Sequence, residues 1–251
     1  MKFHLSAAVA ALMLCSSSGA LAEEVTLIAP ASMRCPIDRL IPDFQTKTGR
    51  TLKPTFGAGG RTHEQVVKGE PFDVPIVQPP YEDVLKSGNV VLSTETPLAT
   101  VSVVAVVRKG ERTPDISTPD AVKRLMLSVK AISYPDGAGG AAAGVSVDAT
   151  FTRLGILEQM KPRVTRVRGV SLMKLLTNGD IDVALTFASE VDDPGVVVVG
   201  PLPRELSTPT SFVGFISSHA TAQEAARALL SYLSGPEAAA AYRACRMQPG
   251  R

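Results

Sequence analysis

Apolar runs suited to buried strands alternate along this chain with segments of helical apolar spacing. Residues 25–29 form a short, almost continuous apolar run, which is typical of a strand covered on both faces. The next segment predicts a helix that ends at Gly49, because its apolar residues recur at helical spacing: Ile37, Leu40, Ile41 and Phe44. The fold therefore opens with a strand followed by a helix.

The same alternation continues through the first hundred residues. It predicts strands over 51–56 and 72–77, and helices after Arg61 and from Pro79-Pro80 to about Gly88. Strands that alternate with helices in this way form a parallel sheet with helices on both faces. We therefore assign the chain to the α/β class.

A second α/β unit follows. Residues 101–107 are rich in valine and predict one long strand. Thr118 begins a helix, because it is followed by proline at the first helical position and by an acid in the first turn. The remaining pattern predicts strands over 130–134, 164–167, 181–185, 196–199 and 212–217, and helices over 141–155, 171–177, 222–233 and 236–242.

Each unit contains a glycine-rich turn between a strand and a helix. The first turn covers 57–61 and the second covers 137–144. Glycine lets the backbone approach a ligand, and the free N–H groups at the start of the next helix attract an anion. Open α/β sheets bind ligands beyond the carboxyl ends of their strands. We therefore expect the two turns to face each other across a cleft that closes over a small anion.

Residues 1–22 have the composition of a secretory signal peptide. Lys2 precedes a short apolar run, and Ala20-Leu21-Ala22 is a cleavage site of the small-x-small type. We therefore expect cleavage after Ala22 and export of the mature chain to the periplasm. The length that remains fits one large domain or two smaller lobes.

Composition and motifs exclude several other classes. The net charge is only +2 and tryptophan is absent, so no nucleic-acid surface is expected. The chain has no Walker loop, CxxC or HExxH motif, and we expect neither a cofactor nor a metal. Cys35 and Cys245 remain after cleavage. They pair in the oxidising compartment or stay as separate buried thiols, and the sequence leaves both possibilities open.

Six segments in order resemble the periplasmic molybdate-binding proteins, a branch of the type 2 periplasmic solute-binding proteins. They run through nearly the whole mature chain: 27–32, 56–60, 72–76, 135–155, 178–184 and 233–238. The resemblance implies a two-lobed clamshell, in which each lobe is a mainly parallel sheet flanked by helices. It places the first lobe at 23–100 plus 206–251 and the second at 101–205.

The oxyanion site of that family uses two serines, backbone amides and a tyrosine. The resemblance places Ser32 on the first serine but Gly59 on the second, and the tyrosine region falls on 186–189, which has no phenol. Two hydroxyl donors are therefore missing. The predicted ligand-binding set is Ser32, Arg34, Ala58, Gly59, Gly60, Arg61, Gln78, Ala143, Gly144 and Ser189.

Arginines stand near the turns where those hydroxyls are missing. Arg34 and Arg61 flank the first lobe's turns, and Arg168 follows a predicted strand of the second lobe. A guanidinium matches a carboxylate with two parallel hydrogen bonds, whereas neutral donors suffice for a tetrahedral oxyanion. The sequence therefore favours a di- or tricarboxylate ligand over a molybdate-type oxyanion.

Two functions follow from these features. The first is a monomeric solute-binding protein, at most peripheral to the membrane, that delivers its anion to an ABC-type permease. The second is a periplasmic tricarboxylate isomerase on the same fold, similar to aconitate isomerase, which requires a base beside an acidic C–H. The candidate bases are His63, Glu64, Asp136 and Glu190, and no motif singles one out.

Overall fold

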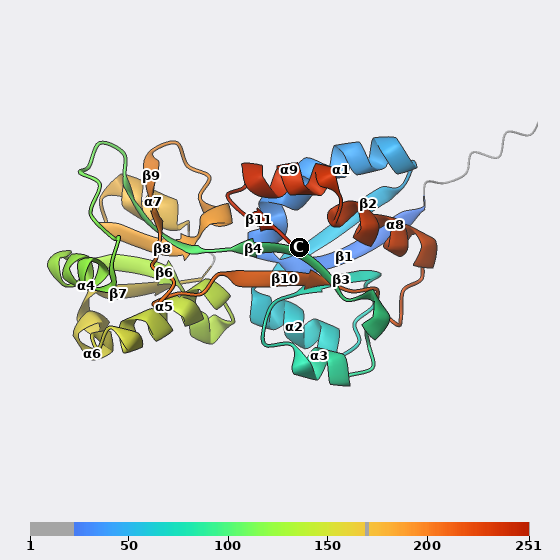
Figure 1. Cartoon of the computed structure of the whole chain (residues 1–251), viewed down its shortest axis with the longest axis horizontal. Helices are drawn as coiled ribbons and strands as arrows, with labels where there is room; N and C mark the ends of the chain where they lie inside the picture. Colours follow the sequence, from blue (N-terminus) through green and yellow to red (C-terminus); the bar gives the residue numbers. More distant parts are fainter. Residues whose placement is uncertain (1–22, 169–170, 251) are drawn as a thin grey trace, which may run out of the picture.

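Two lobes, each built around one β-sheet, form the molecule (Figure 1). The computed structural model describes residues 23–168 and 171–250. The signal peptide predicted over 1–22 therefore lies outside the described residues. The two sheets and the helices that flank them confirm the two-lobed α/β clamshell.

The first lobe contains six strands and five of the α-helices among the described residues. The strands are β1 (Glu24–Pro30), β2 (Thr51–Gly57), β3 (Val74–Val77), β4 (Thr96–Val101), β10 (Thr210–Gly214) and β11 (Gln248–Pro249). The helices are α1 (Arg34–Thr48), α2 (Gly59–Val67), α3 (Glu82–Lys86), α8 (Gln223–Leu233) and α9 (Pro236–Ala244). The sheet has the order β11-β4-β10-β3-β1-β2, and β1 pairs in parallel with both β2 and β3.

The second lobe contains the strands β5 (Val103–Arg108), β6 (Ile132–Pro135), β7 (Val164–Val167), β8 (Val183–Phe187) and β9 (Val196–Pro201). Its helices are α4 (Pro119–Ser128), α5 (Ala142–Arg153), α6 (Leu157–Met160) and α7 (Leu172–Asn178). The sheet has the order β7-β6-β8-β5-β9, with β6 parallel to β7 and β8. Tyr134 of β6 packs edge-on against Phe151 of α5, with 5.8 Å between the ring centroids.

Both sheets are mixed: most strands of each sheet run in one direction, as expected, and a minority run against them. In the second lobe β5 runs antiparallel to β8 and β9, and in the first lobe β10 runs antiparallel to β3 and β4. The cause is the path of the chain. β5 and β10 each enter their sheet from the other lobe, so they run away from the cleft, whereas the strands that precede helices run toward it.

The single long strand predicted over 101–107 is two strands in different sheets. Val101 ends β4 in the first lobe and Val103 begins β5 in the second, with Ser102 between them. A valine-rich run fits either sheet, so its pattern does not mark where the chain leaves one sheet for the other. The chain returns to the first lobe over 202–209.

A disulfide closes the first lobe. Cys35 in the first turn of α1 is bonded to Cys245 directly after α9, so the pairing left open by the sequence is the one observed. The two cysteines are 210 residues apart in the sequence. It thereby attaches the C-terminal segment to the start of α1, which lies next to the cleft.

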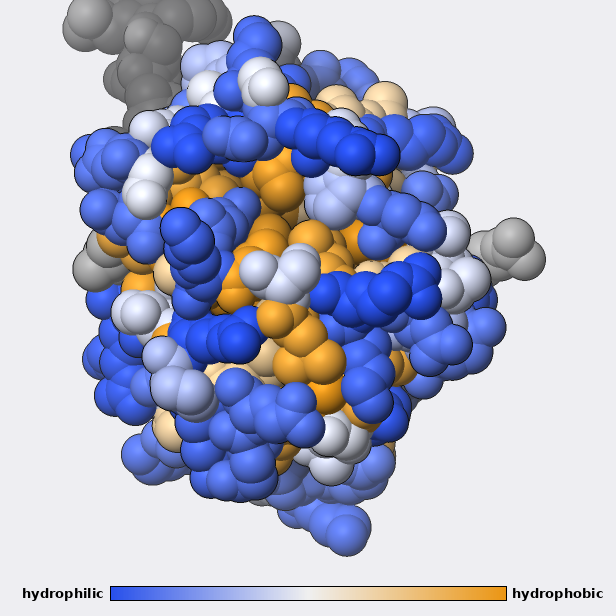
Figure 2. Space-filling view, turned by 90° about the vertical axis from the view of Figure 1, so that its left-hand side faces the viewer, coloured by the Kyte–Doolittle hydropathy of each residue, from blue (hydrophilic) through white to orange (hydrophobic). Residues whose placement is uncertain are grey.

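None of the described helices combines the length and the apolar character that a membrane crossing requires. The far end of the second lobe shows polar and charged residues around a hollow in which apolar residues are visible (Figure 2). The main concave features that both lobes line are instead the pockets described next.

Candidate functional site

The two glycine-rich turns meet directly between the lobes. The N–H of Gly60 donates to the carbonyl oxygen of Gly140 over 2.9 Å, and a Cβ added to Gly60 would lie 3.0 Å from the Cα of Gly140. Only glycine at both positions allows this approach. The expectation that the turns face each other is therefore confirmed. The contact separates a cavity of about 320 Å³ from a more open one of about 710 Å³.

Two helices present uncapped N-termini to the smaller cavity. The N-cap residues of α2 and α5 are Ala58 and Ala141, and neither helix has a side-chain cap. The first bonds within these helices are donated by Thr62 and Val145, so the N–H groups before them have no partner inside the helix.

In the second lobe α6 likewise has no side-chain cap, whereas two other helices do. Thr118 caps α4 and Ser171 caps α7, each accepting a backbone N–H with its side chain. An alanine at such a position forgoes about 1 kcal/mol of helix stability. Two helices that forgo it and lie opposite each other leave N–H groups and positive dipole ends for an anion in the cavity.

The first lobe also contributes two neutral polar side chains. Ser32 and Gln78 both line the smaller cavity and are buried, with 3% and 8% of their surface exposed. A Cβ added to Gly59 would lie 2.2 Å from Nε2 of Gln78. The carboxamide therefore fills the space next to Gly59. The buried Oε1 atom of Gln78 has no hydrogen-bond partner among the described residues, so this acceptor is available to a donor group of a ligand.

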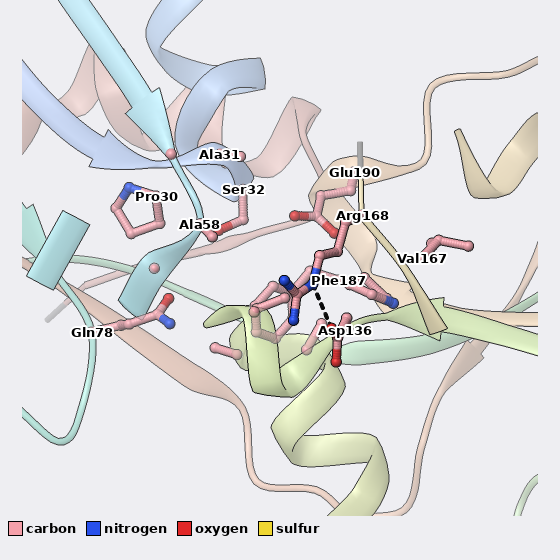
Figure 3. A pocket seen from close by; sticks show the side chains of 17 residues that line it. Pro30, Ala31, Ser32, Ala58, Gln78, Asp136, Val167, Arg168, Phe187 and Glu190 are labelled. Atoms are coloured by element: carbon pink, nitrogen blue, oxygen red, sulfur yellow. Dashed lines mark hydrogen bonds and ion pairs between the residues drawn. The ribbon is translucent and has the colours of Figure 1, made fainter. Parts of the chain in front are cut away.

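The second lobe contributes the charged groups. Arg168 follows β7, lines the cavity and pairs with Asp136, with 2.5 Å between Nε and Oδ2 (Figure 3). A side chain at Gly139 would collide with this guanidinium, since a Cβ there would lie 2.7 Å from Nε of Arg168. The Arg168 hydrogen bond lowers the pKa of Asp136, whose other oxygen accepts the N–H of Ala138.

The pKa of Glu190 is shifted in the opposite direction from that of Asp136. It ends the 3-10 helix Ala188–Glu190 after β8, and its carboxyl group points into the cavity between Ser32 and Arg168 (Figure 3). Burial raises the pKa of Glu190, although a hydrogen bond from the Thr186 hydroxyl opposes the rise. Of the four candidate bases, Glu190 alone lines the smaller cavity with a raised pKa.

Several predicted residues lie elsewhere. Arg34 is exposed and stacks over the ring of Phe56, 4.3 Å from its centroid, and Arg61 is exposed on α2. Neither arginine lines either cavity between the lobes. Glu64 is also exposed and pairs with Lys68 over 3.7 Å. Contrary to expectation, none of these three side chains lines a cavity between the lobes.

Other predicted residues border the site or support it. His63 lines the larger cavity and contacts Asp83 over 2.7 Å, and Gly60 lies there too. Gly144 allows α5 to pack on β6, since a Cβ there would lie 2.0 Å from the carbonyl oxygen of Pro135. Ser189 is buried but does not line the smaller cavity, and its hydroxyl has no partner among the described residues. Ala58, Gly59 and Ala143 line the smaller cavity.

Sequence reasoning missed the apolar walls of the smaller cavity. They come mainly from strand ends and helix starts: Pro30, Ala31, Gly57, Pro135, Ala141, Ala142, Val167 and Phe187. The rule that ligands bind at the carboxyl ends of strands could have found five of these residues, because each ends a strand. The rule does not say which strand ends share one cavity.

The fold is a two-lobed α/β clamshell with a cleft between the lobes, and comparison with known sequences identifies its family. Residues 25–244 match the model of the bacterial extracellular solute-binding protein family, and the chain belongs to this family.

Two curated relatives extend over nearly the whole chain. The chain is 25% identical to an aconitate isomerase of a Pseudomonas species, over 96% of this chain and 95% of the relative. It is 26% identical to the molybdate-binding protein ModA of Azotobacter vinelandii, over 95% of each. Among solved structures, the periplasmic molybdate-binding protein of A. vinelandii superposes with a TM-score of 0.73 at 17% identity, covering 89% of this chain and 98% of that chain.

Proposed function

We propose that this protein is a periplasmic solute-binding protein that closes over a small anion and presents it to an ABC-type permease. The observation that carries the proposal is the pair of uncapped helix N-termini, α2 and α5, on opposite sides of one cavity. Each end favours a negative charge. The relatives named for binding molybdate support the anion class and the periplasmic location.

For the ligand we propose a di- or tricarboxylate. Three separate features favour negative charge around the cavity: the start of α2, the start of α5 and the Arg168 guanidinium. Apolar walls at Val167 and Phe187 suit a carbon skeleton. The cavity of about 320 Å³ is at the lower end for organic ligands. A tetrahedral oxyanion occupies only roughly the space of a few water molecules of about 30 Å³ each.

The molybdate-type oxyanion is the competing ligand class, because Ser32 and the helix amides are the neutral donors that such an anion uses. A calorimetric panel of cis-aconitate, trans-aconitate, citrate, sulfate and molybdate separates the two. We expect binding of at least one tricarboxylate. Tight binding of molybdate alone would refute the carboxylate class, and binding of none of these anions would refute the anion proposal.

The Ser32→Ala variant tests the place of binding. Loss of one buried donor to a charged ligand is expected to weaken binding by about 1.5–3 kcal/mol, which is roughly 10- to 150-fold. Ser128→Ala is the matched control, because Ser128 is exposed at the end of α4 in the second lobe. Equal affinities of the two variants would place the anion elsewhere.

A second candidate function is isomerisation of a tricarboxylate, which one observation favours. Glu190 places a carboxyl group of raised pKa inside the cavity, as a general base near neutral pH requires. The aconitate isomerase relative supports the same reaction. The ultraviolet absorbance of cis- and trans-aconitate reports it directly. Turnover that is lost in Glu190→Gln makes the protein an enzyme, and tight binding without turnover makes it a binding protein.

A further inference from the structure

Glu190 conflicts with the other groups in the cavity. The uncapped ends of α2 and α5 and the Arg168 guanidinium favour an anion, whereas an ionised Glu190 carboxylate repels one. Figure 3 shows its carboxyl oxygens directed into the space that Ser32 and Gln78 border from the opposite lobe. An anion that fills this space has to lie against them.

The surroundings of Glu190 offer its carboxylate little compensation. Among the ion pairs of the described residues none includes Glu190, and Arg168, the cation at the cavity, pairs with Asp136. Asp192 lies with Glu190 along a neighbouring hollow and adds further negative charge. Arg246 of the first lobe uses its guanidinium on the carbonyl oxygen of Val191, 2.7 Å away.

Two neighbouring donors, the Thr186 hydroxyl and the backbone N–H of Phe187, act to lower the pKa of Glu190. The Thr186 hydroxyl donates to Oε2, which makes that oxygen an acceptor. A proton on the other oxygen converts it into a donor, and a neutral carboxyl group in an apolar site can donate to an anion. Burial is the larger effect and favours this proton, because it raises the pKa of Glu190.

We propose that Glu190 carries a proton in the complex and donates it in a hydrogen bond to the bound anion, so that anion binding takes up one proton. This inference rests on the proposed function and adds the charge state of its site. The residue then acts as a selectivity switch. Protonated Glu190 admits an anion, and ionised Glu190 disfavours it, so that uptake is favoured in acidic surroundings.

The main test measures proton uptake by calorimetry in two buffers of different ionisation enthalpy, between pH 5.5 and 8.5. The probes are trans-aconitate and molybdate, and the protein is the mature wild-type chain. We expect about one proton taken up per anion above the pKa of free Glu190, with the affinity falling tenfold for each pH unit in that range. This measurement needs no variant, so it does not depend on whether a substitution folds.

The Glu190→Gln variant separates Glu190 from protonation of the probe itself. Glutamine keeps a donor and cannot ionise, so we expect binding that takes up no proton from the protein and stays constant where wild-type affinity falls. Glu64→Gln is the matched control, because Glu64 is exposed on α2, and it is expected to keep the wild-type pH profile.

The outcomes distinguish the two proposals. Binding of either probe without proton uptake at every pH of the range, or affinity that rises with pH, overturns the role of Glu190 and leaves the anion-binding function intact. Failure of both probes to bind at any pH overturns the anion-binding function and this inference with it. An equal pH profile in Glu190→Gln and wild type overturns the assignment to Glu190.

Discussion

Substitution of Gly60 by alanine tests whether contact between the two turns is required for ligand capture. In the closed arrangement the new Cβ would lie 3.0 Å from the Cα of Gly140 and 3.5 Å from its carbonyl oxygen. These atoms belong to the backbone, so no side-chain rotation relieves the overlap. The lobes have to separate by a few tenths of an ångström, and the 2.9 Å hydrogen bond between the turns weakens.

The size of the effect follows from two contributions. Overpacking of this kind costs about 1–3 kcal/mol, and a net hydrogen bond contributes about 0.5–1.5 kcal/mol. Together they predict a loss of about 1.5–4.5 kcal/mol, or roughly a 10- to 2,000-fold weaker affinity for an anion held between the closed lobes. The ligand-free protein is not expected to lose stability, because alanine is a better helix residue than glycine at the start of α2.

Calorimetry with the tightest-binding anion of the panel measures the loss, and small-angle X-ray scattering measures closure. We expect a larger radius of gyration for the liganded variant than for the liganded wild type. Arg61→Ala is the control on the same helix, since Arg61 is exposed and lines neither cavity. An affinity of Gly60→Ala within threefold of wild type, with an unchanged Arg61→Ala, would show that ligand capture does not depend on this contact.

Three further predictions concern stability. Asp73→Ala is expected to lower the free energy of unfolding by about 2–5 kcal/mol in urea titrations at pH 7, because the buried Asp73 carboxylate accepts the N–H groups of Thr26, Thr221 and Ala222. Asp38→Ala is the control, since Asp38 is exposed, and equal losses in the two variants would contradict the role of Asp73. Burial acts to raise the pKa of Asp73, but these hydrogen bonds lower it overall, so this contribution is present above the unfolded pKa of about 3.8 and is lost as the pH falls through the folded value. Reduction of Cys35–Cys245 is expected to cost about 5 kcal/mol, because the bond closes a loop of 210 residues, and two free thiols in the unreduced mature protein would contradict the bond. Burial raises the pKa of Glu190 in the folded protein above the unfolded value of 4.5, so the free energy of unfolding falls as the pH rises from the unfolded to the folded pKa. Glu190→Gln should therefore melt at a higher temperature than wild type at pH 8 but not at pH 4. A lower melting temperature of the variant at pH 8 would contradict the burial argument.

The elements of this fold were largely predictable because they depend on local spacing. Gly49 ends α1 in the left-handed conformation, and Thr118 caps α4, as the residue pattern predicts. The crossing at Ser102 was not predictable, because the valines on both sides of it are equally suited to either sheet. A hydrophobic pattern reports that a residue is buried and does not report which partner buries it.

The candidate site was also predictable only in part. The sequence by itself determined that two glycine turns each begin a helix, and that Ser32, Gln78, Asp136 and Glu190 follow strands or turns near the cleft. Those features depend on residues that are adjacent in the chain.

Only the tertiary structure decided which charged groups reach the ligand. Successive residues of a helix point about 100° apart, so the contact of Gly60 with the opposite lobe turns Arg61 away from the cavity. Arg168 reaches the cavity because Gly139 leaves room for its guanidinium and Asp136 holds it there. The direction of a side chain depends on packing between segments that are far apart in the sequence. The spacing of residues within one segment does not predict that packing.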